Sequence, residues 1–111
     1  MINQVILVGR ITDVFKMNES KNGNKYATNT LAVPRTYKNE NGEYETDFIP
    51  FKVYGNMANT TCEYCKKGDV LGIKGNLSSY KNELFLNANR VTFISSKSIK
   101  DDLVEEKDIK M

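Results

Sequence analysis

Apolar and polar residues alternate in short runs along most of this chain, which is the pattern of β-strands. The clearest run is residues 48–55, FIPFKVYG. One face of this extended segment is apolar: Ile49, Phe51 and Val53. The other face carries two aromatic rings, a proline and a cation: Phe48, Pro50, Lys52 and Tyr54. The first set predicts a core face, whereas the second exceeds what a purely structural strand requires.

Further strand-like runs cover residues 4–12, 25–33, 69–80 and 84–95. Turn-forming residues separate the first two, and the dipeptide Asn41-Gly42 predicts the tip of a long polar hairpin over residues 35–47. A tight turn at residues 81–83 joins the last two runs into a final hairpin. Glycines within the strands allow the sharp bends that a barrel needs.

Residues 56–67 are the one plausible helix, with Lys66 and Lys67 as a basic last turn and Gly68 as its stop. All-β architecture with five strands and one short helix between strands 3 and 4 is the outline of an OB-fold barrel. An SH3-like barrel shares most of this order. We assign residues 1–96 to a single OB-fold domain and residues 97–111 to a short charged C-terminal tail.

The composition gives the chain little net charge. The formal net charge is +2, and the first 96 residues hold 12 Lys and Arg against 9 Asp and Glu. Attraction to phosphate therefore requires that the cations gather on one face. The chain starts without a basic, apolar leader and contains no apolar run of membrane-spanning length, so we expect a cytoplasmic protein that does not enter membranes.

Enzymatic chemistry finds no support in the residue types. The chain has no histidine and no glycine-rich phosphate loop, so neither a nucleophile with its usual base nor a nucleotide cradle can be assembled. Cys62 and Cys65 form a Cys-x-x-Cys motif, but zinc requires two more ligands, and the end of a helix disfavours a thiolate. We interpret both as small core residues. Redox chemistry and a metal site completed across subunits are the alternatives, and we predict no cofactor.

Eleven aromatic residues are interleaved with cations, the combination that binds single-stranded nucleic acid by stacking on bases and following phosphates. The stacking candidates are Tyr37, Phe48, Tyr54 and Tyr80. The cations interleaved with them are Arg10, Arg35, Lys38, Lys52, Lys74 and Lys81. The alternative is that these rings fill a barrel end or a subunit interface.

Several separated motifs in residues 1–95 resemble the bacterial and phage single-stranded DNA-binding protein family. They are Asn3-x-Val-Ile-Leu-Val-Gly-Arg, residues 31–39 (LAVPRTYKN), residues 41–49 (NGEYETDFI), Val53-Tyr-Gly and residues 63–69 (EYCKKGD). The resemblance implies an OB-fold homotetramer that coats single-stranded DNA during replication, recombination and repair. It implies stacking roles for Tyr37, Phe48 and Tyr54, and phosphate contacts for Lys67 and Lys81.

The chain departs from the family pattern in three places. Asn82 stands at the fourth stacking position, and we substitute Tyr80, which lies on the same strand face. The hairpin at residues 81–83 is abbreviated, which predicts a smaller footprint. The last residues lack the glycine-rich linker and terminal Pro-Phe of cellular members, which suggests a phage, plasmid or mobile-element version, or a specialised paralogue.

We therefore expect a non-enzymatic protein that binds single-stranded DNA without sequence preference. The alternative is an OB-fold protein-interaction module of the primosome type, which would use the same aromatic rings to contact replication or recombination proteins.

Overall fold

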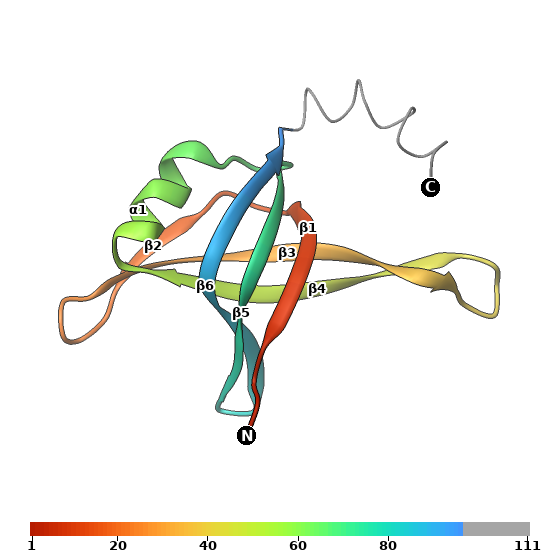
Figure 1. Ribbon diagram of the computed structural model, residues 1–111, viewed down its shortest axis with the longest axis horizontal. Helices are drawn as coiled ribbons and strands as arrows, with labels where there is room; N and C mark the ends of the chain where they lie inside the picture. Colours follow the sequence, from red (N-terminus) through yellow and green to blue (C-terminus); the bar gives the residue numbers. More distant parts are fainter. Residues whose placement is uncertain (97–111) are drawn as a thin grey trace.

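Six strands and one helix make up residues 1–96, the part of the chain that the computed structural model describes (Figure 1). The elements in chain order are β1 (Val5–Ile11), β2 (Lys16–Glu19), β3 (Lys25–Lys38), β4 (Tyr44–Tyr54), α1 (Gly55–Tyr64), β5 (Val70–Tyr80) and β6 (Glu83–Ser95). The predicted tail, residues 97–111, lies outside the described residues.

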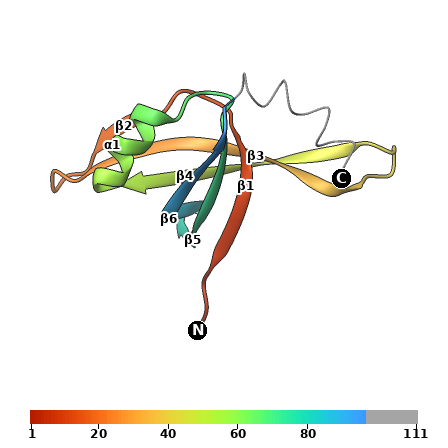
Figure 2. The same cartoon turned by 45° about the horizontal axis from the view of Figure 1, so that its top comes forward.

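The strands close into a barrel. Their order in the sheet is β1-β5-β6-β4-β3-β2, and β1 also pairs with β3 through Arg10 and Ile11. On the opposite side, β4 and β6 pair in parallel at Phe51 with Leu86 and at Lys52 with Asn87. Figures 1 and 2 show β1, β5 and β6 crossing the long ribbon of β3 and β4.

The predicted five-stranded OB-fold is confirmed. Both β1 and β2 pair with β3, so they occupy the place of one bent strand. Counted in this way, the barrel has five strands, and α1 joins the third to the fourth.

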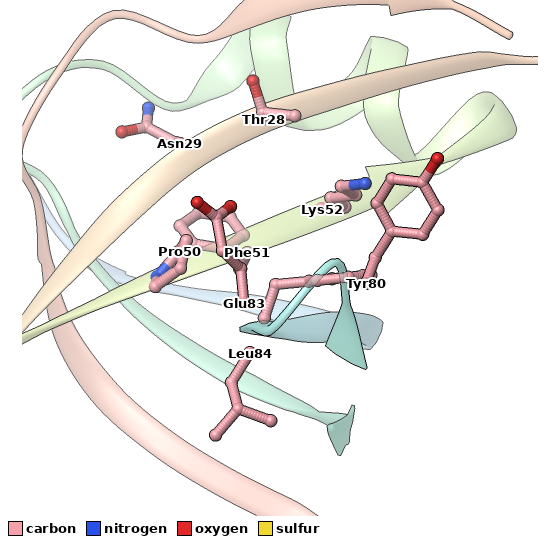
Figure 3. A pocket seen from close by; sticks show the side chains of 9 residues that line it. Thr28, Asn29, Pro50, Phe51, Lys52, Tyr80, Glu83 and Leu84 are labelled. Carbon is pink, nitrogen blue, oxygen red and sulfur yellow. The ribbon is translucent and has the colours of Figure 1, made fainter. Parts of the chain in front are cut away.

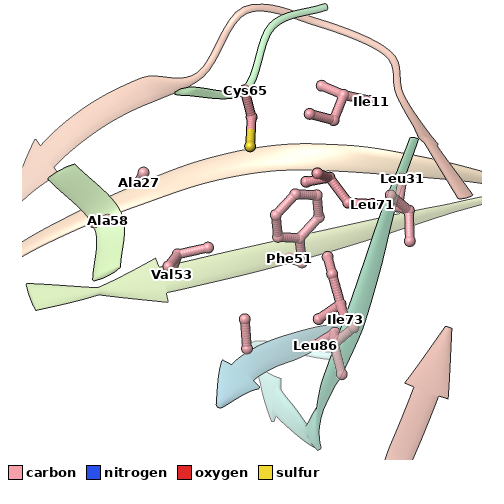
Figure 4. Packing of buried hydrophobic residues seen from close by; sticks show 11 residues of the cluster. Ile11, Ala27, Leu31, Phe51, Val53, Ala58, Cys65, Leu71, Ile73 and Leu86 are labelled. Carbon is pink, nitrogen blue, oxygen red and sulfur yellow. The ribbon is translucent and has the colours of Figure 1, made fainter. Parts of the chain in front are cut away.

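The core lies where the two layers of strands cross (Figure 4). Its buried members are Ile11, Ala27, Leu31, Phe51, Val53, Ala58, Cys65, Leu71, Ile73, Leu86 and Ala88. The alternation predicted for residues 48–55 is confirmed, because Phe51 and Val53 are buried and Ile49 packs against the cluster. Phe15 meets the Phe51 ring edge-on at 5.9 Å between centroids.

Helix α1 is shorter than predicted. It ends at Tyr64 with no basic residue in its last turn, so the prediction of a basic end at Lys66 and Lys67 is wrong. The Lys66 backbone N–H instead donates to the Asp69 carboxylate at 2.8 Å, and the Asp69 N–H donates to the Lys66 carbonyl at 2.9 Å. This separate turn fixes the lysines outside the helix. Within residues 1–96, no helix is long and apolar enough to cross a membrane.

Two hairpins project from the barrel. The β3–β4 hairpin turns at Gly42, whose φ of +80° is the left-handed conformation that glycine adopts without strain. The β5–β6 hairpin closes at the pair Tyr80 and Glu83, with Lys81 and Asn82 both at positive φ. Two consecutive positive φ values are those of a type I′ turn, which matches the twist of the strands and keeps this hairpin tight.

Gly9 permits the closest approach between β1 and β3. A Cβ atom on Gly9 would lie 2.5 Å from the Ala32 carbonyl oxygen and 2.9 Å from Leu31 Cγ. The obstructing atoms belong to the backbone and to a buried core side chain, so moving them aside costs free energy. The closure of the barrel at β1 therefore depends on glycine at this position.

Gly9→Ala is expected to lower the free energy of unfolding by about 1–3 kcal/mol, because it overpacks this crossing. Urea denaturation measures the change. Gly72→Ala is the matched control, since a Cβ there meets Ile94 Cδ1 at 3.4 Å and nothing closer. Equal stability of the two variants would contradict the role of Gly9.

Candidate nucleic-acid interface

A groove of about 490 Å³ separates the β3–β4 ribbon from the β5–β6 hairpin (Figure 3). Strand β3 lines it with Thr28 and Asn29, and β4 lines it with Pro50, Phe51 and Lys52. The β5–β6 hairpin contributes Tyr80, Glu83, Leu84 and Phe85. The walls combine aromatic faces with one cation and one carboxylate. Such a surface suits flat, uncharged rings attached to a charged backbone.

Lys52 lies at the centre of the aromatic wall. Its Nζ atom is 4.2 Å from the centroid of the Phe85 ring and 5.4 Å from that of Tyr26. Both contacts are cation–π interactions, which hold the ammonium group over the rings. The predicted cation of the outer β4 face therefore lies between rings contributed by β3 and β6.

Tyr54 extends this wall along β4. Its ring lies 5.8 Å from that of Tyr26, and its hydroxyl donates to Asn87 Oδ1 at 3.2 Å. Partial burial, and to a smaller extent the neighbouring Tyr26, raises the pKa of Tyr54. The hydroxyl is therefore neutral at physiological pH, and the ring remains 45% exposed.

Tyr80 forms the opposite wall of the groove. Its side chain is 64% exposed, and Lys81 Nζ lies 5.3 Å from its ring centroid. The type I′ turn fixes both residues at the hairpin tip. The substitute stacking residue chosen from the sequence thus lines the same groove as Lys52 (Figure 3).

The long β3–β4 hairpin carries the remaining predicted rings. Phe48 is 64% exposed and shares the outer face of β4 with Lys52 and Tyr54. Tyr37 is 63% exposed, and the neighbouring Lys38 lies 5.8 Å from the Tyr44 ring. Exposed rings therefore continue from the groove onto the hairpin.

Arg35 is held inside this hairpin by two carboxylates. Its guanidinium lies 2.9 Å from Asp47 and 2.8 Å from Glu45. Asp47 precedes Phe48, so this ion pair occupies the face of β4 opposite to Phe48. The hydrogen bond from Arg35 holds the pKa of Asp47 below its ordinary value, although burial acts in the other direction.

The other predicted cations lie apart from the groove. Arg10 donates to the Gly68 carbonyl at 2.8 Å and is half-buried. Lys67 borders a separate cavity beside α1. Lys74 is exposed directly opposite Arg90 in the β5–β6 register. The structure thus gathers Lys52, Tyr54 and Tyr80 with Lys81 but does not bring all eleven predicted residues into one cluster.

Two rings that lie close to Lys52 were not predicted as site residues from the sequence, Tyr26 and Phe85. Each alternates with core residues of its strand, Tyr26 before Ala27 and Phe85 before Leu86. The two-residue period alone could have placed both on an outer face. Their meeting at Lys52 depends on the register of β3, β4 and β6.

The structure supports the interpretation of both cysteines as packing residues. Cys65 belongs to the buried core and Cys62 packs against it. Both are free thiols. Burial raises the pKa of each thiol, and for Cys65 the nearby Asp69 adds to the effect. A raised pKa disfavours the thiolate that redox catalysis requires.

The barrel and its exposed aromatic and cationic groove define an OB-fold protein of the kind that binds single-stranded nucleic acid. A family model described as the single-strand binding protein family matches residues 2–100. This chain belongs to that family.

Curated relatives carry related names. Single-stranded DNA-binding protein B of Bacillus subtilis (strain 168) is 39% identical over 89 residues, which are 78% of this chain and 79% of that protein. The single-stranded DNA-binding protein of Streptococcus mutans is 41% identical over 85 residues, which are 75% of this chain and 52% of that protein. Single-stranded DNA-binding protein A of Bacillus subtilis is 40% identical over the same share of this chain and 49% of its own length. The chain thus spans about half the length of several relatives.

Arg35→Gln is expected to raise the pKa of Asp47 towards its ordinary value, because the donor that favours the carboxylate is removed. A carboxyl group with a lowered pKa in the folded state adds stability above its unfolded pKa, and that stability is lost as pH falls through the folded value. Carbon NMR of the Asp47 carboxyl group during an acid titration measures the pKa of that group in the wild type and in the variant. An unchanged midpoint in the variant would contradict the ion pair.

Proposed function

We propose that this protein binds single-stranded DNA without sequence preference and coats it during replication, recombination and repair in the cytoplasm. One observation carries the proposal: Tyr80 and Phe85 of the β5–β6 hairpin line a groove together with Lys52, whose ammonium group lies near the rings of both Phe85 and Tyr26. The protein acts by binding and needs no cofactor or catalytic step.

Stacking provides the selectivity for single strands. Tyr54 and Tyr80 beside the groove, with Phe48 and Tyr37 on the hairpin, stack on unpaired bases. Each stacked base contributes about 1–3 kcal/mol. Duplex is excluded because its paired bases have no free faces, and sequence is not read because every base has such a face. Tyr26 and Phe85 hold the Lys52 ammonium group through cation–π contacts.

Cations near these rings accompany the phosphates. Lys52 and Lys81 lie against the groove rings, Lys38 lies on the hairpin, and Lys74 with Arg90 forms an exposed positive pair on β5 and β6. Like charges directly opposite each other on a sheet are destabilising, and a bound phosphate relieves that repulsion. Arg10, Arg35 and Lys67 contribute less to phosphate binding. The two arginines already make bonds within the chain, and Lys67 lies beside α1.

We further propose that the protein forms a homotetramer. Over Val5–Gly9, strand β1 pairs with β5 but not with β3, which leaves one edge open in the described chain. Ile6 and Val8 on this strand are 67% and 53% exposed. Ile94 lies beside Val8 across Gly72. An apolar open edge favours pairing with another strand, and a second copy supplies an identical one, which accounts for one of the interfaces that a tetramer requires.

Tyr80→Ala and Phe48→Ala are each expected to weaken binding to oligo-dT by about 1–3 kcal/mol. Neither should alter thermal stability comparably, because both rings are about two-thirds exposed. Tyr64→Ala is the matched control, since Tyr64 is 68% exposed at the end of α1 and lines no part of the groove. Fluorescence titration measures affinity, and thermal unfolding measures stability.

Unchanged affinity in both the Tyr80 and the Phe48 variant would contradict the stacking proposal. It would favour the alternative, an OB-fold module whose exposed rings contact replication or recombination proteins. That alternative also predicts that the wild-type protein does not bind oligo-dT.

Val8→Glu is expected to shift the protein from tetramers to smaller species, because it places a charge on the open β1 edge. Sedimentation equilibrium reads the assembly directly as a multiple of the 12.6 kDa chain. Val14→Glu is the control at a valine that is 67% exposed elsewhere. A tetramer that survives Val8→Glu but not Val14→Glu would place the interface away from β1.

A further inference from the structure

Three sulfur-bearing side chains line a second cavity of about 420 Å³ beside α1. Cys62 and Cys65 line it from the end of the helix, and Met17 lines it from β2. Lys66 and Lys67 complete its rim. This cavity shares no lining residue with the aromatic groove.

Two of the sulfur atoms lie close enough to share one metal ion. Cys62 Sγ is 3.3 Å from Met17 Sδ. Two metal–sulfur bonds of about 2.3 Å, the length found at zinc thiolates, can span that separation. Cys65, which directly follows the last residue of α1, lines the same cavity.

We propose that Met17, Cys62 and Cys65 form a binding site for a soft monovalent metal ion, Cu(I). The Cys-x-x-Cys motif alone has two of the four ligands that zinc requires. The fold adds a thioether from a distant strand, which yields a three-sulfur set. Thiolate and thioether ligands select Cu(I) over harder ions.

The charged groups around the cavity suit the same ion. On binding, both thiols release their protons to solvent, and the two thiolates with Cu(I) carry a net charge of −1. The ammonium groups of Lys66 and Lys67 at the rim offset that charge. The bound ion would tie β2 to the end of α1.

The test is anaerobic titration of the full chain with Cu(I) buffered by bicinchoninate, a chromophoric Cu(I) chelator. The wild-type protein is expected to take one Cu(I) per chain from the chelator and to unfold at a higher temperature when loaded, because the ligand binds the folded state. Cys62→Ser and Cys65→Ala are expected to abolish this transfer. Met17→Leu should weaken binding by about tenfold or more, since even the loss of an outer-shell partner costs about that much.

Met57→Leu is the matched control, because Met57 packs against the core from the same helix but does not line the cavity. Met17 is 43% exposed, so its leucine variant is expected to fold normally, as thermal unfolding of the metal-free protein would verify. Cu(I) binding that is the same in Met17→Leu as in the wild type would overturn the three-sulfur site. Failure of the wild-type protein to take Cu(I) from the chelator would overturn the proposal altogether.

Discussion

The parallel pairing of β4 with β6 is the contact on which both the barrel and its groove depend. At Phe51 and Leu86 this pairing closes the core, since both side chains are almost completely buried. One residue further on, Lys52 lies on the outer face, where its ammonium group meets Phe85 of β6. A shift of one residue in this register would exchange the two faces. The same register that buries the core therefore assembles the aromatic wall.

Individual contacts of the cations, rather than the net charge, determine the electrostatics of this protein. Residues 1–96 carry a small excess of positive charge, and several cations are already engaged, Arg35 by two carboxylates and Arg10 by a carbonyl oxygen. The Arg35 ion pair ties the two strands of the long hairpin together behind Phe48. Lys52 and Lys81, by contrast, are held over aromatic rings rather than by carboxylates. Binding by stacking with a few well-placed cations needs no large overall charge.

Local rules predicted the barrel and part of the site. The two-residue period separated Phe51 from Lys52, and turn chemistry located both hairpins. The same period could have placed Tyr26 and Phe85 on the outer faces of their strands. Only the register of the strands brings both rings to Lys52. The end of α1 was misjudged, because the Asp69 carboxylate captures the Lys66 backbone in a turn that spacing does not reveal. Likewise, the approach of Met17 to Cys62 joins residues 45 positions apart, which no motif encodes.

The most direct test of the central claim is a titration of the protein with oligo-dT of increasing length and with matched duplex, at two salt concentrations. The chain has six tyrosines and no tryptophan, so tyrosine fluorescence reports on the stacking rings. The structure predicts quenching by the single strand only, and an affinity that falls with salt at a log–log slope of about −0.7 per phosphate neutralised. Absence of binding, or equal binding to duplex, would contradict it.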